Sequence, residues 1–155
     1  MNSKYEINTK ENREFLKASC EDLLNFGHRF PSPNGGSYYL GDDGTPWKDR
    51  NRETWITCRM AHVYSLGLML GHEGSGELAD AALKGLRGEL HDEKNGGWYA
   101  GVTPEGDIVP NKQCYAHAFV ILAASSALTA GRSGAEELLD EALAVYDQYF
   151  WNEEE

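Results

Sequence analysis

The sequence repeats itself with a period of about sixty positions, and this period limits the folds that the chain can adopt. Leu23, Leu83 and Leu143 follow one another at a constant spacing, and Trp55 and Tyr115 are separated by the same interval. A fixed period of this length is typical of a solenoid, or of a closed ring built from one supersecondary unit. Such units bury their apolar faces only against their neighbours. We therefore expect function to lie where several units meet.

Five helical segments are predicted, and they are of two kinds. The segments at 10–27, 75–90 and 134–150 are amphipathic, with apolar side chains on one face and charged side chains on the other. The segments at 54–70 and 113–130 are apolar around most of their circumference, which indicates burial on several sides. The alternation predicts an all-α fold in which outer and inner helices form two concentric layers.

The long connections that lead from an outer to an inner helix are predicted to form short β-hairpins. The segments 37–47 and 98–109 each contain a turn, Asp43-Gly44 in the first and Glu105-Gly106 in the second, beside aromatic and β-branched residues. The opposite connections are short, so all long loops fall on one face, where sites are usually built. A ring of six helix pairs needs about 360 residues on this period, and the chain holds about two and a half pairs.

Composition argues against several classes of partner. The chain has 155 residues, of which 41% are apolar, with a formal net charge of −11 and a pI near 4.8. An acidic chain without a basic patch is a poor partner for nucleic acid or for an anionic membrane surface. No segment approaches the roughly 18 apolar residues of a membrane span. Cys20, Cys58 and Cys114 form no Cys-x-x-Cys pair and leave one thiol unpaired, which favours a cytoplasmic location.

Arg59 is the strongest candidate for a functional side chain. It lies one turn into an inner helix and one helical turn after Trp55, so the two side chains share a face. A buried guanidinium is costly unless it is paired, which leaves two interpretations open. One is a structural ion pair with an acidic residue of a neighbouring helix. The other is an arginine that binds anionic or hydroxyl groups beside an aromatic platform, because its five donors form a fixed fork.

Other candidates lie near the starts of the inner helices. Tyr115 occupies the position of Trp55 one period later, so both are predicted to line one pocket, with core packing as the alternative. His62 and His117 are candidate general bases, since histidine titrates near neutral pH, with a structural role as the alternative for each. Glu53 and the loop acids are expected to be solvated rather than to form a glycosidase-type pair. No phosphate-binding, nucleophile or zinc motif is found, and no cofactor or metal is expected.

Two sequence blocks carry a resemblance to a known family. The pattern W-I-T-x-R-M-x-H-V-Y at 55–64 and the segment G-G-W-Y-A at 96–100 are similar to the N-acylglucosamine 2-epimerase superfamily. The chain looks closest to the aldose–ketose isomerase branch, which includes sulfoquinovose isomerase and mannose isomerase, and the resemblance runs from about position 26 to the end of the chain. It implies an (α/α)6 barrel, of which residues 1–155 form the N-terminal part of a single domain, truncated at its C-terminus.

The resemblance also implies a function. Members of the isomerase branch open the ring of a monosaccharide and move a proton between adjacent carbons through a cis-enediol, without a metal or a nucleotide. Arg59 matches an arginine that contacts substrate oxygens and can stabilise the developing enediolate. Trp55 and Tyr115 match pocket-lining aromatics, and His117 matches a histidine beside that pocket. The proton-transferring histidines of the family lie on later inner helices.

Three functions remain open from the sequence. The first is the N-terminal part of a sugar isomerase, inactive alone because no residue here corresponds to the proton-transferring histidines. The second is a helical module that binds a sugar or a protein partner without catalysis. The third, an (α/α)6 glycoside hydrolase fragment, is disfavoured because no acid pair is evident. An open barrel edge is expected to expose the apolar flank of the fourth and fifth helices and to promote self-association.

Overall fold

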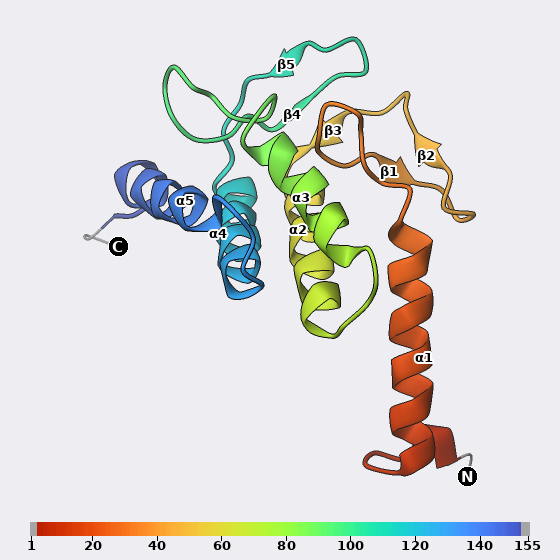
Figure 1. Ribbon diagram of the computed structural model, residues 1–155. Helices are drawn as coiled ribbons and strands as arrows, with labels where there is room; N and C mark the ends of the chain where they lie inside the picture. The colour runs from red at the N-terminus through yellow and green to blue at the C-terminus, as the bar shows by residue number, and fades with distance from the viewer. Residues whose placement is uncertain (1–2, 153–155) are drawn as a thin grey trace.

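The computed structural model describes residues 3–152 of the chain. Helices dominate these residues, and the strands are only two residues long (Figure 1). A short 3-10 helix, η1 (Ser3–Tyr5), precedes five α-helices. The α-helices are α1 (Lys10–Gly27), α2 (Thr54–Met69), α3 (Ser75–Leu86), α4 (Cys114–Thr129) and α5 (Ala135–Tyr149).

The two inner helices lie side by side, and each carries an outer helix. α2 packs against α4, while α3 packs on α2 and α5 packs on α4. Small residues allow this close approach, because a buried alanine lets neighbouring backbones come near one another at little cost in packing. The buried alanines are spread over all four helices, at Ala61, Ala79, Ala82, Ala116, Ala123, Ala124, Ala127, Ala135 and Ala142. The predicted alternation of inner and outer helices is thus present.

Both predicted hairpins form on one side of the helices, at the top of Figure 1. In the first, β1 (Tyr39–Leu40) pairs with β2 (Pro46–Trp47), and in the second, β4 (Gly101–Val102) pairs with β5 (Ile108–Val109). A further strand, β3 (Arg52–Glu53), was not expected from the sequence, and it pairs with β4. The second hairpin is therefore joined to the residues that lead directly into α2.

The third helix ends earlier than the sequence indicates. A helix over 75–90 was predicted, but α3 ends at Leu86. The first long loop crosses the end of this helix, where the Gly36 N–H donates to the carbonyl of Ala81 at 3.2 Å. A Cβ atom on Gly85 would lie only 2.3 Å from the Gly36 nitrogen, so only glycine permits the crossing. Beyond Gly85 the chain turns back on itself, because the Leu90 N–H bonds to the carbonyl of Gly85.

Apolar side chains remain exposed on two flanks of the structure. On α4 and α5 they are Leu122, Leu128, Leu143 and Tyr149, as the sequence led us to expect. A second flank, which was not expected, lies on α1 and α2 and includes Leu16, Leu23, Val63, Leu66 and Met69, with Leu70 directly after α2. Figure 1 shows α1 projecting well below the other helices, and its buried residues are confined to Leu24 and Gly27. Within residues 3–152, no helix has both the length and the apolar character needed to cross a membrane.

Candidate functional site

Arg59, Trp55 and Tyr115 come together where α2 and α4 begin. The Arg59 guanidinium carbon lies 4.7 Å from the centre of the Trp55 ring, and Nη2 donates to the Tyr115 hydroxyl at 3.2 Å. The Trp55 and Tyr115 rings approach edge to face, with centroids 6.0 Å apart. This follows from the repeat, because Trp55 and Tyr115 occupy the first turn of adjacent inner helices. Arg59 is one turn further along the same face of α2.

Phe119 completes this cluster and was not identified from the sequence. Its ring centre lies 4.9 Å from the Arg59 guanidinium carbon and 4.9 Å from the centre of the Tyr115 ring. The guanidinium therefore contacts two aromatic rings, those of Trp55 and Phe119, which favours the cation through the negative faces of the rings. A signal was present in the sequence, because Phe119 stands one full period after Arg59.

The expected alternative for Arg59, a buried ion pair, does not occur. The Arg59 side chain is exposed, and among the ion pairs of residues 3–152 none includes it. The open flank of α2 explains the exposure, because no described helix covers this face. A guanidinium has five N–H donors, and the described hydrogen bonds use one of them, to Tyr115. The remaining donors are available to a ligand that carries hydroxyl, carbonyl or anionic oxygens.

Glu53 is bonded rather than solvated, contrary to the expectation for this residue. Its Oε2 atom accepts a hydrogen bond from the Trp55 indole Nε1–H at 2.8 Å and a short one from the Tyr39 hydroxyl. Burial and this contact with Glu53 raise the pKa of Tyr39 far above its usual value. No local sequence pattern indicated the arrangement, because Tyr39 reaches Glu53 only through the β1–β2 hairpin.

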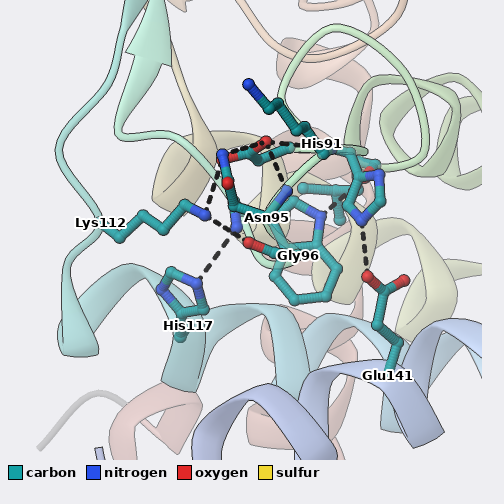
Figure 2. Close-up of polar contacts among 10 residues, drawn as sticks. His91, Asn95, Gly96, Lys112, His117 and Glu141 are labelled. Atoms are coloured by element: carbon teal, nitrogen blue, oxygen red, sulfur yellow. Dashed lines mark hydrogen bonds and ion pairs between the residues drawn. The ribbon is translucent and has the colours of Figure 1, made fainter. Parts of the chain in front are cut away.

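His117 bonds to the second long loop (Figure 2), and no described hydrogen bond links it to Arg59. Its Nε2 atom accepts a hydrogen bond from the Trp98 backbone N–H at 3.1 Å, and Nδ1 donates to the carbonyl of Gln113 at 2.8 Å. The side chain is fully buried, and this burial lowers its pKa. Both ring nitrogens are thus engaged with the backbone, and the neutral ring with its proton on Nδ1 satisfies both bonds.

The same loop is held by an ion pair, also drawn in Figure 2. Lys112 Nζ lies 2.7 Å from Asp92 Oδ2 and also donates to the carbonyl of Gly96. Asp92 in turn accepts the Asn95 backbone N–H at 3.0 Å. The bonds from Lys112 and Asn95 hold the pKa of Asp92 well below its usual value. On the far side of the loop, His91 Nε2 pairs with Glu141 at 2.6 Å.

A cavity of about 310 Å³ adjoins this loop, and three of its polar side chains are already engaged. It is lined by Asn95, Lys112, His117, Val145, Tyr149 and Phe150. Asn95, Lys112 and His117 each bond to other protein groups, so they support the loop rather than face a ligand. In residues 3–152 no group of three or more His, Cys, Asp or Glu side chains is placed to hold a metal ion.

His62, the other histidine considered as a base, connects the two inner helices. Its Nδ1 lies 2.6 Å from Ser126 Oγ on α4, and that hydroxyl donates to the carbonyl of Leu122 at 2.8 Å. The serine hydroxyl can donate only one hydrogen, so Nδ1 of His62 is the donor to Ser126. The side chains that contact one another around Arg59 are Trp55, Tyr115 and Phe119, and Glu53 bonds to Trp55, so these five residues form the candidate site.

Comparison with known proteins relates the chain to a family. The model of the N-acylglucosamine 2-epimerase family matches residues 35–155. The chain is 42% identical over 143 residues to a D-mannose isomerase of Thermobifida fusca, and 34% identical over 149 residues to one of Pseudomonas cannabina pv. alisalensis. These matches cover 92% and 96% of the chain but only 35% and 36% of the relatives. The chain thus spans about a third of the curated relatives' length.

Solved structures agree on the fold. A crystal structure of D-mannose isomerase superposes with a TM-score of 0.82 at 24% identity, covering 96% of this chain and 38% of that one. A cellobiose 2-epimerase from Bacillus thermoamylovorans superposes with a TM-score of 0.77 at 25% identity, covering 92% of this chain and 39% of that one. The all-α, partial (α/α)6 barrel that the family resemblance implied is therefore confirmed, and it agrees with the two helix layers predicted from the period. The chain belongs to the N-acylglucosamine 2-epimerase family.

Proposed function

We propose that this chain forms the arginine-containing wall of a monosaccharide pocket in a sugar isomerase that interconverts aldoses and ketoses. The observation that carries the proposal is Arg59, which is exposed, has no carboxylate partner among residues 3–152 and is held between Trp55 and Phe119. A cation kept in place by aromatic rings and one hydroxyl is suited to oxygen-rich ligands. The curated relatives named D-mannose isomerase support the same class of substrate.

The chemistry of such an isomerase explains why an arginine is needed. When a proton leaves the carbon beside the carbonyl, negative charge develops on the carbonyl oxygen and a cis-enediol forms. Arg59 would donate to that oxygen and stabilise the charge, and its ring contacts spare it from reorganising during the reaction. Trp55 and Tyr115 would pack against the C–H face of the sugar.

His117 enters the proposal as an anchor of the second loop and not as a proton carrier, because both of its nitrogens bond to the backbone. The family resemblance assigns proton transfer to histidines of later inner helices. We therefore expect the chain alone to have no isomerase activity. No cofactor or metal is expected, and a cytoplasmic location remains a prediction. The glycoside hydrolase alternative loses support, because the matching family model describes an epimerase.

The proposal is tested by Arg59→Ala in the complete product of the reading frame. Solvent proton exchange into D-mannose, D-glucose, D-fructose and sulfoquinovose is followed in heavy water. Loss of a donor to the developing charge should lower kcat by about 10²–10³-fold, with thermal stability nearly unchanged because the side chain is exposed. Arg13→Ala, on the projecting part of α1, is the matched control and should leave turnover intact.

Several outcomes would argue against the proposal. Unchanged turnover together with lower thermal stability would assign Arg59 a purely structural role. Sugar binding without proton exchange in the complete wild-type product would favour the non-catalytic binding module. Exchange catalysed by the chain alone and abolished by His117→Ala would overturn the assignment of His117 as a loop anchor.

A further inference from the structure

The Glu53 carboxylate stands at the start of α2 but does not bond to its own helix. Glu53 is the N-cap residue of α2, and its side chain makes no hydrogen bond to the first amides of the helix. Among acidic residues it is the shorter aspartate that usually accepts such an amide hydrogen at the N-cap, so the longer glutamate side chain is free to reach other donors. The Glu53 carboxylate instead turns toward two aromatic side chains.

A single oxygen of Glu53 binds both donors. Oε2 accepts from the Trp55 indole at 2.8 Å and, by a short bond, from the Tyr39 hydroxyl. Tyr39 belongs to β1 and Trp55 to the first turn of α2, so the carboxylate ties the first hairpin to the inner helix. The Tyr39 and Trp55 rings also meet edge to face, with centroids 6.4 Å apart.

The indole held in this way is the ring on which the Arg59 cluster depends. Trp55 contacts the Arg59 guanidinium on one side and the Tyr115 ring on another. An aromatic ring without a polar bond at its edge can rotate about its outer torsion, which has broad minima. The hydrogen bond from Nε1 to Glu53 removes this freedom, and a charge-assisted bond is stronger than a neutral one.

We propose that Glu53 is a positioning residue of the sugar pocket, which holds Trp55 and Tyr39 so that the indole is preset to pack against the sugar and against Arg59. This inference rests on the proposed function. The repeat supports it, because the equivalent residue one period later is Gln113, and its partner position carries Tyr115, which has no indole N–H to hold. Glu53 acts through Trp55, so it should influence substrate affinity more than the chemical step.

The contact itself is tested without a sugar. Tryptophan is labelled with ¹⁵N in the complete product of the reading frame, and Trp55→Phe assigns the Trp55 indole signal. In Glu53→Ala the indole proton should move upfield, because it loses its bond to a carboxylate, and the signal should broaden as the ring gains freedom. Tyr39→Phe leaves the bond between Glu53 and Trp55 in place and should change the signal less.

The functional consequence is tested by steady-state kinetics with the best substrate of the wild type. Glu53→Ala should raise KM by about tenfold and change kcat by less than about threefold, as expected for a lost charge-assisted bond that acts on binding. Glu53→Gln retains an oxygen acceptor and should restore part of the loss. Glu105→Ala, which removes an exposed acid in the turn of the second hairpin, should match the wild type.

The possible failures are distinguishable. A Trp55 signal that is unchanged in Glu53→Ala, or one that moves while KM stays constant, overturns the positioning role. A fall of about 100-fold in kcat at constant KM also overturns it, because it would place Glu53 in the chemical step. A wild-type protein that neither binds nor converts a monosaccharide overturns the proposed function, and with it the sugar part of this inference.

Discussion

The two long loops of the chain are fastened to the inner helices in the same way by different side chains. In the first loop, Thr57 Oγ1 accepts the Ser37 backbone N–H at 3.0 Å. In the second, His117 Nε2 accepts the Trp98 backbone N–H at 3.1 Å. Thr57 and His117 are separated by one period, so they hold equivalent places in the repeat. What the repeat preserves here is a hydrogen-bond acceptor for a buried amide, and not a residue type.

A second pair of equivalent residues, Arg52 and Lys112, holds the same loops through hydrogen bonds and ion pairs made by a positively charged side chain. Arg52 donates to Ser32 Oγ at 2.9 Å and to the carbonyl of Gly35 at 3.4 Å, and it pairs with Glu89 at 2.6 Å. Lys112, one period later, reaches Asp92 and the carbonyl of Gly96. The positions of the loop partners also correspond, since Asp92 follows Ser32 by the same period.

At two positions of the candidate site, the equivalent residues of the two units differ in chemistry. Arg59 faces Phe119, its own equivalent, and Glu53 corresponds to Gln113. The loop-anchoring positions keep their role from one unit to the next, whereas these two positions change their chemistry, although Trp55 and Tyr115 remain aromatic in both units. Residues that anchor a loop therefore differ in this respect from Arg59 and Glu53. His117 is a loop anchor, because its equivalent Thr57 accepts a loop amide in the same way.

The largest effect is expected from Gly97→Ala in the second loop, compared with Gly36→Ala in the first. A Cβ on Gly97 would lie 2.7 Å from His117 Nε2 and 3.1 Å from Val145 Cγ1, whereas one on Gly36 would lie 3.3 Å from Thr57 Oγ1. Both backbones have positive φ, which adds about 1–2 kcal/mol of strain. Gly97→Ala should lower the free energy of unfolding by about 3 kcal/mol or more, and Gly36→Ala by less.

Urea unfolding followed by circular dichroism measures both values. Gly106→Ala is the control for strain alone, because its φ is +96° and no atom lies within 4 Å of the added Cβ. Equal losses for Gly36 and Gly97 would show that the imidazole yields as readily as the threonine hydroxyl, and would weaken the view of His117 as a rigid anchor.

A medium effect is expected from His117→Thr, which gives the second loop the acceptor type of the first. The shorter side chain leaves the buried Trp98 amide poorly paired, at a cost of about 1–3 kcal/mol near neutral pH. Thr57→Val removes the acceptor of the first loop and should cost a similar amount. Denaturant titrations of the two variants compare the anchors directly.

Of the two loop anchors, only His117 should make a contribution to the free energy of unfolding that depends on pH. Burial lowers the pKa of His117 from its reference of 6.5, so the unfolded chain binds the proton more readily. The stability that neutral His117 contributes is complete above this reference and is lost as the pH falls toward the lowered pKa. The stability gap between wild type and His117→Thr should shrink from about pH 7 to pH 5, whereas the gap to Thr57→Val should stay constant. A constant gap for both would contradict the assigned bond.

The smallest effect is expected from Lys112→Arg, which places the cation of the first loop in the second. Both side chains reach a loop carbonyl and an acidic group, so the free energy of unfolding should change by less than about 1 kcal/mol. Lys112→Ala should cost clearly more, because Asp92 is buried and would lose its cation. Thermal unfolding measures both variants. If Lys112→Arg lowers the free energy of unfolding as much as Lys112→Ala does, arginine cannot replace lysine in the second loop.

The period was enough to predict the helices and their layers, because it depends on apolar positions that recur on a regular face. The range of α1 and both hairpins followed from the same local patterns. The early end of α3 did not, since it depends on Gly36 crossing Gly85 from a distant segment. Strand β3 was missed for a related reason, because its partner β4 lies far along the chain, beyond α2 and α3.

The site was predictable only where side chains share one helix face. Trp55, Arg59 and Tyr115 followed from helical spacing and the period, and the structure brings them together. Glu53 was expected to be solvated. Its bond to Tyr39 could not be predicted, because it forms only once the first hairpin has folded. His117 was considered a base because histidine titrates near neutral pH, while its buried contact with Trp98 has no local signature.

The pairing of β3 with β4 gives the repeat a direction. The Thr54 N–H, the first of α2, donates to the carbonyl of Ala100, and its hydroxyl donates to that of Tyr99. The start of one inner helix is therefore completed by the loop of the following unit, and not by its own. Opening the second hairpin therefore uncaps α2, and because such coupling is reciprocal, an intact α2 stabilises the second hairpin in turn.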